Sequence, residues 1–142
     1  GHIFFNLNYY GFDDALYSSV KLVELLDKQS KKLSEIVDQF PKSFNTPEIR
    51  LECNDLKKFE IINKVTSNQK RKNQEVIDID GVRVSSENGW WLLRASNTQA
   101  ELVLRCEANS FENLKKELSL VKEAIFEVDS ELSDKILVEN YV

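Results

Sequence analysis

The alternation of apolar and polar residues in the first part of the chain predicts a short strand and two helices. Residues 3–5 are apolar and predict the strand, and Asp13 and Asp14 are favourable residues for the start of a helix. A second helix is predicted over residues 33–40, ended by Pro41. The expected apolar face of the first helix comprises Leu16, Val20, Val23 and Leu26.

The rest of the chain predicts several short strands and two further helices. Residues 48–53 alternate between polar and apolar side chains, which is typical of a half-buried strand. Asn54 or Asp55 caps the next predicted helix, residues 67–73 predict a loop, and Asn109 is expected to cap the last helix. Further strands are predicted over residues 76–79, 82–84, 90–93 and 102–108, and the stripe of the last helix comprises Phe111, Leu114, Leu118, Val121, Ile125 and Val128.

This order of elements indicates how the chain is divided. Strands with two segregated helices predict a two-layer α+β domain over residues 48–142. Residues 1–40 then form a separate strand-helix segment, and residues 41–47 are the best linker and hinge candidate. Asn88-Gly89 predicts a two-residue hairpin turn, because both residues tolerate positive φ.

Composition restricts the classes of protein to which the chain can belong. The 142 residues have room for one domain and an appendage, and a hydrophobic fraction of 42% supports a core. A net charge of −5 argues against a general binder of nucleic acid or acidic membranes. We expect a cytoplasmic protein, because no segment resembles a signal peptide or a membrane span. The chain starts with glycine and contains no methionine, so we expect it to be cut from a longer protein.

The two cysteines, Cys53 and Cys106, fall on the apolar phase of their predicted strands. Reduced core thiols are the favoured interpretation, and a bridge across neighbouring strands is the alternative.

The segment between the last two predicted strands has the composition of an anion site. Arg94 offers a planar fork of donors, Ser96 and Thr98 offer hydroxyl groups, and Asn97 offers an amide. A tight turn can also direct backbone N–H groups toward one ligand. These residues therefore predict a phosphate site at the end of a hairpin.

The same region resembles a known family. Residues 80–84 (Asp-Gly-Val-Arg-Val), 89–98 (Gly-Trp-Trp-Leu-Leu-Arg-Ala-Ser-Asn-Thr) and 102–108 (Leu-Val-Leu-Arg-Cys-Glu-Ala) resemble the C-terminal domain of the phosphohexomutases, in the bacterial phosphomannomutase/phosphoglucomutase variant. Residues 1–5 and 10–17 resemble the end of the family's third domain. The resemblance implies a TATA-binding-protein-like fold for residues 48–142, an antiparallel sheet with two helices, preceded by a remnant of an α/β domain.

The resemblance also implies a function. In the family the matching loop binds the phosphate that is not being transferred, which assigns that role to Arg94, Ser96, Asn97 and Thr98. His2 matches a proposed general base and is a candidate catalytic residue. The parent enzyme would interconvert hexose 1-phosphates and 6-phosphates of mannose or glucose, with Mg²⁺ as cofactor. We expect no partner other than the phosphosugar, no nucleic acid and no membrane, and a monomer is favoured.

This chain lacks the family's phosphoserine loop and its Asp-x-Asp-x-Asp metal loop, so we expect it to be inactive alone and to hold no metal. Two alternatives stay open: a non-enzymatic module that binds a phosphorylated ligand or a protein, and a phosphoglucosamine mutase. Asn97 argues against the second, because that branch more often has glycine there. Gln99-Ala100 departs from the commoner family sequence.

Other candidate groups have simpler interpretations. Lys70-Arg71-Lys72 is interpreted as a solvated loop rather than an anion site. Asp78 and Asp80 share a strand face but are interpreted as turn residues without acid or base chemistry. Trp90 and Trp91 point to opposite faces of a strand, so one of them is expected in the core.

Overall fold

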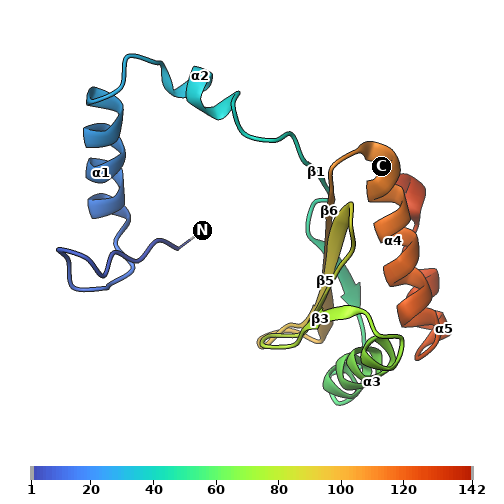
Figure 1. The fold of residues 1–142 in the computed structure, drawn as a ribbon. Helices are drawn as coiled ribbons and strands as arrows, with labels where there is room; N and C mark the ends of the chain where they lie inside the picture. The colour runs from blue at the N-terminus through green and yellow to red at the C-terminus, as the bar shows by residue number, and fades with distance from the viewer. Residues whose placement is uncertain (1, 142) are drawn as a thin grey trace. The chain divides into compact units, whose positions relative to one another are not determined.

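The computed structural model describes residues 2–141 and separates into two units, Gly1–Pro41 and Lys42–Val142 (Figure 1). The first unit contains α1 (Ala15–Asp27) and α2 (Leu33–Val37). Asp14 caps α1, because its side chain accepts the Tyr17 N–H at 2.9 Å. The predicted apolar face of α1 is largely exposed within its unit.

Two predictions for the first unit were wrong in extent. The strand over residues 3–5 is reduced to one isolated β-bridge between Phe4 and Asp13. The second helix ends at Val37, because the following amides bond three residues back, as in the Phe40 N–H to Val37 carbonyl bond of 3.0 Å.

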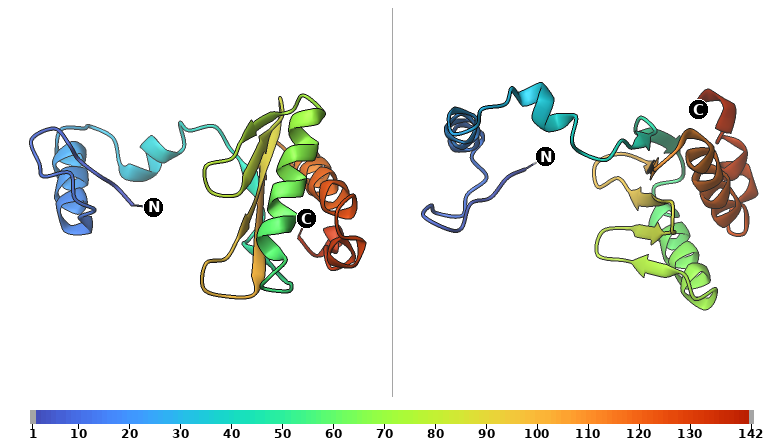
Figure 2. Two further views of the ribbon diagram at one scale, coloured as in Figure 1. Left: turned by 90° about the horizontal axis from the view of Figure 1, so that it is seen from below. Right: turned by 45° about the horizontal axis from the view of Figure 1, so that its top comes forward.

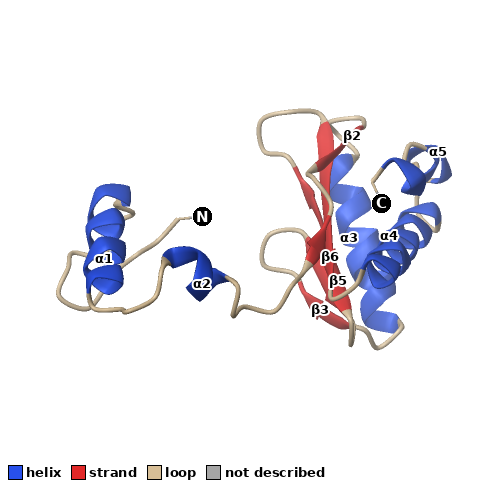
Figure 3. Ribbon diagram, turned by 90° about the horizontal axis from the view of Figure 1, so that it is seen from above, coloured by secondary structure: helices blue, strands red, loops and turns tan. Residues whose placement is uncertain are grey.

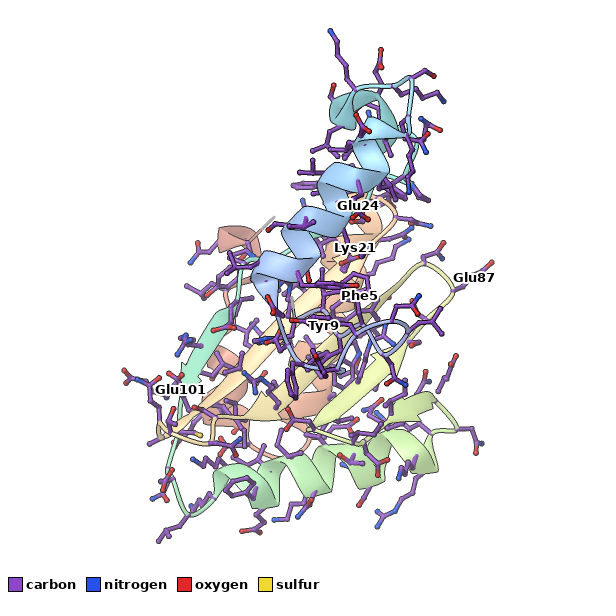
Figure 4. The ribbon with its side chains drawn as sticks, turned by 90° about the vertical axis from the view of Figure 1, so that its left-hand side faces the viewer. Phe5, Tyr9, Lys21, Glu24, Glu87 and Glu101 are labelled. Carbon is purple, nitrogen blue, oxygen red and sulfur yellow. The ribbon has the colours of Figure 1, made fainter. Side chains whose placement is uncertain are left out.

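An aromatic cluster stabilises the start of α1. Tyr9 stacks on Tyr17, Phe5 meets the Tyr17 ring edge-on, and Figure 4 shows Phe5 and Tyr9 beside this helix.

The second unit is an antiparallel sheet covered on one face by helices, so the predicted α+β class is confirmed (Figures 2 and 3). The strand order is β1-β6-β5-β4-β3, and β2 also pairs with β6. The strands are β1 (Phe44–Asn45), β2 (Ile49–Glu52), β3 (Glu75–Ile77), β4 (Val82–Ser85), β5 (Gly89–Ala95) and β6 (Glu101–Ala108). The helices are α3 (Lys58–Arg71), α4 (Phe111–Phe126), α5 (Ser130–Asp134) and the 3₁₀ turn η1 (Val138–Asn140).

Strand alternation sets the two faces of this sheet. Along β5, Trp91, Leu93 and Ala95 are buried against the helices, whereas Trp90 and Arg94 are half-exposed on the opposite face. The expectation for the two tryptophans is therefore confirmed. The predicted stripe of α4 supplies the other side of the core through Leu114, Leu118, Val121 and Ile125.

The structure corrects several boundaries in this unit. Residues 44 and 45 of the predicted linker form β1, because they pair with the end of β6. The loop predicted over residues 67–73 is helical to Arg71, since Gln69 is buried on the inner face of α3 and the basic residues lie at its negative C-terminal end. The cap of α4 is Ser110 rather than Asn109, and α5 was not predicted.

The hairpin predicted at Asn88-Gly89 is present between β4 and β5, but its central residues are shifted by one. The Ser86 N–H donates to the Gly89 carbonyl at 2.9 Å, so Glu87 and Asn88 are the central turn residues. Neither Asn88 nor Gly89 is among the positive-φ positions of residues 2–141. Gly89 is needed for space instead, because a Cβ there would lie 2.5 Å from the Glu107 carbonyl oxygen.

Candidate phosphate-binding site

The predicted phosphate loop joins β5 to β6. The Ser96 N–H donates to the Glu101 carbonyl at 3.0 Å and closes the hairpin. Glu101, at the start of β6, lies at the opposite end of the sheet from Glu87 in the β4–β5 turn (Figure 4). The structure therefore brings Arg94, Ser96, Asn97 and Thr98 together at one end of the sheet.

Ser96 organises the loop from within. The residue is buried, at 8% exposure, and its Oγ accepts the N–H groups of Thr98 at 3.4 Å and Gln99 at 3.2 Å. Such a local bond from side chain to backbone is a common way for serine to fix a tight turn. The Ser96 hydroxyl hydrogen can still be donated, because an oxygen that accepts two bonds keeps its own donor.

Arg94 stands on the open face of the sheet with its guanidinium available. Its side chain is 38% exposed, and its nearest charged neighbour is Asp80, with Nη1 3.6 Å from Oδ2. Within residues 2–141 the guanidinium makes no hydrogen bond. A planar fork of donors held beside a loop with exposed Asn97 and Thr98 suits a tetrahedral dianion.

Gly81, the residue just before β4, lies against the backbone at Arg94. Its φ is +88°, a value that favours glycine. An added Cβ would lie 2.4 Å from the Leu93 carbonyl oxygen and 2.6 Å from the Arg94 Cβ. The close approach of β4 to β5 at Arg94 therefore depends on this glycine.

Gln99 and its neighbours form a polar network on the β2 side of the loop. Arg50 Nη1 donates to Gln99 Oε1 at 2.9 Å and to Glu101 Oε1 at 2.5 Å, and Nη2 donates to Glu48 at 2.5 Å. These carboxylates, Glu48 first, raise the pKa of the Arg50 guanidinium. Arg50 is thus engaged by carboxylates, unlike Arg94.

Sequence reasoning missed Lys58. Its side chain is buried at the first position of α3, and Nζ donates to the carbonyl oxygens of Ser96 at 2.6 Å and Gln99 at 3.0 Å. One signal in the sequence was available: Lys58 occupies the same helical face as Ile61, Ile62 and Val65. A lysine on an apolar face indicates a buried polar partner.

The matches to known proteins agree with this geometry. The family model of the phosphoglucomutase/phosphomannomutase C-terminal domain matches residues 48–126. The chain belongs to this family. The resemblance that the loop and its flanking strands carried is thereby confirmed.

Individual phosphohexomutases match over more of the chain. A phosphomannomutase/phosphoglucomutase of Pseudomonas putida is 39% identical over 132 residues, which are 93% of this chain and 28% of that protein. A phosphoglucosamine mutase of Methanocaldococcus jannaschii is 37% identical over 117 residues, 79% of this chain and 26% of that protein. The crystal structure of a phosphoglucomutase/phosphomannomutase family protein from Burkholderia thailandensis has a TM-score of 0.77 and 34% identity, and covers 89% of this chain and 26% of that one. The chain thus spans little more than a quarter of the length of these relatives.

His2 belongs to the other unit of this phosphohexomutase segment. Its ring is 79% exposed, and Nδ1–H donates to the carboxylate of Asp13. The four loop residues lie in the second unit, Lys42–Val142, whereas His2 lies in the first.

The remaining candidates are engaged in surface or core contacts. Lys70 pairs with Asp78 at 2.6 Å, which lowers the pKa of that carboxyl, and Lys72 pairs with Glu127 at 2.5 Å. Arg83 lies 4.7 Å from the ring centre of Trp90. Cys53 and Cys106 are free thiols, as favoured from the sequence, and burial raises the pKa of both.

Residues 2–141 contain neither a metal-binding cluster nor a membrane-spanning helix. No group of three or more His, Cys, Asp or Glu side chains in that range is arranged to hold a metal ion. Over the same range, no helix combines the length and apolar composition that crossing a membrane requires.

Proposed function

We propose that this chain is the part of a phosphohexomutase that binds the phosphate group of the phosphosugar that is not being transferred. The observation that carries the proposal is the Arg94 guanidinium, which lies beside a closed loop and is free of hydrogen bonds within residues 2–141. Ser96, Asn97 and Thr98 supply the remaining donors.

The energetics of a phosphate support this assignment. A dianion needs several donors and local positive charge, and each charge-assisted hydrogen bond contributes about 1.5–3 kcal/mol. The chain as a whole carries a net charge of −5, so this charge has to come from the site itself. Arg94 meets that need, because Asp80, its carboxylate partner within residues 2–141, is exposed, lies 3.6 Å away and leaves the guanidinium donors free of hydrogen bonds.

The whole enzyme would interconvert the 1-phosphate and 6-phosphate of mannose or glucose, which is the activity that the names of its relatives suggest. A bisphosphorylated intermediate must present either end to the phosphoryl donor. A site that binds the phosphate group rather than the sugar therefore suits both orientations of the intermediate. This chain's own residues bind and orient the substrate. Mg²⁺ would belong to loops of the parent enzyme outside this chain.

Three further assignments complete the proposal. Residues 48–142 form the phosphate-binding domain and residues 1–40 belong to the preceding domain. The hinge expected over residues 41–47 is limited to residues 41–43, because β1 begins at Phe44, and it lets the phosphate site close over the substrate. His2 is a candidate general base in the intact enzyme. The enzyme is proposed to act in the cytoplasm as a monomer.

The test is an amide NMR titration of the 142-residue chain with inorganic phosphate and with glucose 1-phosphate. Saturable shifts confined to residues 94–100 are expected, and Arg94→Ala should abolish them. The matched control is Arg71→Ala, which removes the same charge from the exposed end of α3 and should leave the titration unchanged. Equal shifts in the wild type and Arg94→Ala would refute the assignment of the site.

A further inference from the structure

The buried ammonium group of Lys58 has three partners, and two of them belong to the phosphate loop. Nζ donates to the carbonyl oxygens of Ser96 and Gln99 and lies 2.6 Å from Asp55 Oδ1. The side chain is only 5% exposed. A lysine has three ammonium hydrogens, so these three partners use all of them.

Burying the Lys58 ammonium group costs free energy, which its partners must offset. Burying an ammonium group requires complete replacement of its water partners. The carboxylate of Asp55 balances the charge, and the two carbonyl groups complete the hydrogen bonding. Both carbonyl groups come from one loop 38 and 41 residues away in sequence, so the contact fixes that loop rather than α3 itself.

The direction of these carbonyl groups determines where the loop's amides point. Residues 2–141 contain no cis peptide bond, and in a trans peptide the N–H points opposite to the C=O. When Lys58 holds the Ser96 and Gln99 carbonyl groups, the N–H groups of Asn97 and Ala100 must point away from it. Neither of these two amides makes a hydrogen bond within the described part of the chain.

That direction is the one that Arg94 faces. Lys58 comes from α3, which packs against the face of β5 that carries Leu93 and Ala95 (Figure 3). The side chain of Arg94 alternates to the opposite face of the same strand. Amides turned away from Lys58 are therefore turned toward the face that carries the guanidinium.

We infer that Lys58 is a positioning residue of the phosphate site, which holds the Asn97 and Ala100 amides in the orientation that an anion requires. The inference rests on the proposed phosphate-binding function. Lys58 itself does not touch the ligand, and Asp55 offsets its charge. Its effect is on the geometry of the loop.

The first experiment compares the wild type with Lys58→Met, which keeps the length of the side chain and removes its donors. In the inorganic phosphate titration, Lys58→Met should bind about tenfold to hundredfold more weakly, the range expected when donors are misplaced by about 1 Å. Lys57→Met, an exposed neighbour, removes an equal charge and should bind as the wild type does. Ile62→Val, a core change in the same helix, should lower the melting temperature without changing the affinity.

The second experiment needs no ligand. Amide ¹⁵N relaxation and hydrogen exchange at Asn97 and Ala100 should show a more mobile loop in Lys58→Met than in Lys57→Met. Unchanged relaxation in Lys58→Met would overturn the inference, whatever the phosphate titration gives. If Lys58→Met does not fold, Lys58→Gln replaces it, because its shorter side chain keeps donors but cannot span both carbonyl groups.

The outcomes separate the two proposals. If the wild type shows loop shifts with phosphate and Lys58→Met shows equal ones, the positioning role is wrong and the phosphate site stands. If the wild type shows no loop shifts, the phosphate site fails. In that case a mobile loop in Lys58→Met limits the role of Lys58 to loop structure and overturns its assignment to a phosphate site.

Discussion

Replacing Gly81 with alanine should both destabilise the second unit and disturb Arg94. Two separate costs follow from the structure. A non-glycine residue at φ of +88° is strained by about 1–2 kcal/mol. The added Cβ would also overlap the Leu93 carbonyl oxygen and the Arg94 backbone, at 2.4 Å and 2.8 Å. These are backbone atoms, so the overlap is relieved only by separating β4 from β5, and overpacking of this kind costs about 1–3 kcal/mol.

The sum, about 2–5 kcal/mol, is a large fraction of the stability of a typical domain. The assay is urea unfolding followed by tryptophan fluorescence, because both tryptophans of the chain, Trp90 and Trp91, lie in β5. With a urea m-value near 2 kcal/mol/M, the midpoint should fall by about 1–2.5 M.

The control is Gly11→Ala, since Gly11 also has a positive φ, of 74°, but lies in the other unit, where an added Cβ would make only an ordinary contact with Asn6 Oδ1 at 3.6 Å. It should leave the fluorescence midpoint unchanged. A second measurement, phosphate affinity in the absence of urea, should fall in Gly81→Ala because β5 moves at Arg94. A midpoint for Gly81→Ala within about 0.2 M of the wild type, a difference of under 0.5 kcal/mol, would refute the reasoning about this close approach.

Three other perturbations give distinct expected results. Asp80→Ala should strengthen phosphate binding by up to about fivefold, because it removes an exposed ion pair from Arg94; weaker binding in the NMR titration would contradict this. Burial raises the pKa of the Glu117 carboxyl, so the native state holds that proton more tightly than the unfolded chain does, and stability falls as the pH rises from below the ordinary carboxyl pKa through the raised value. Glu117→Gln should remove this fall in stability, measured by urea unfolding curves at a series of pH values. An equal pH dependence of stability in the wild type and in Glu117→Gln would contradict the expectation. Leu118→Ala should cost about 2–5 kcal/mol in the same assay, and Leu120→Ala, on the exposed side of α4, less than about 0.5 kcal/mol; equal costs would mean that the helix packs differently.

The sequence was most informative where one periodic pattern decided the outcome. The stripe of α4 and the alternation of β5 predicted most of the buried side chains, because each element has a single apolar face that must meet the core, although Phe111 of the stripe is 48% exposed. The loop residues could be predicted as a group, since the hairpin that carries them is local in sequence.

The errors came from contacts between distant residues. β1 lies in a stretch with no strand pattern and exists only because Phe44 and Asn45 meet the end of β6. The turn at Asn88-Gly89 was assigned from backbone freedom, whereas Gly89 is fixed by the nearness of Glu107. Lys58 was missed for the same reason, because its place on the apolar face of α3 indicates a buried polar partner but not the carbonyl groups, 38 and 41 residues away, that it binds.

One strand, β6, connects the entry of the chain into the second unit with the phosphate loop. Its last residues, Glu107 and Ala108, pair with β1 just after the unit boundary, and its first residue, Glu101, closes the loop. About six residues of extended chain separate these points, a distance of about 20 Å at 3.4 Å per residue. Because β6 is held straight within the sheet, its two ends move together. A change of about 10° in the direction at which residues 42–43 enter the second unit would displace the loop by about 3.5 Å, close to the length of one hydrogen bond. If the loop binds phosphate as proposed, the direction of residues 42–43 would therefore affect where Arg94 meets its ligand.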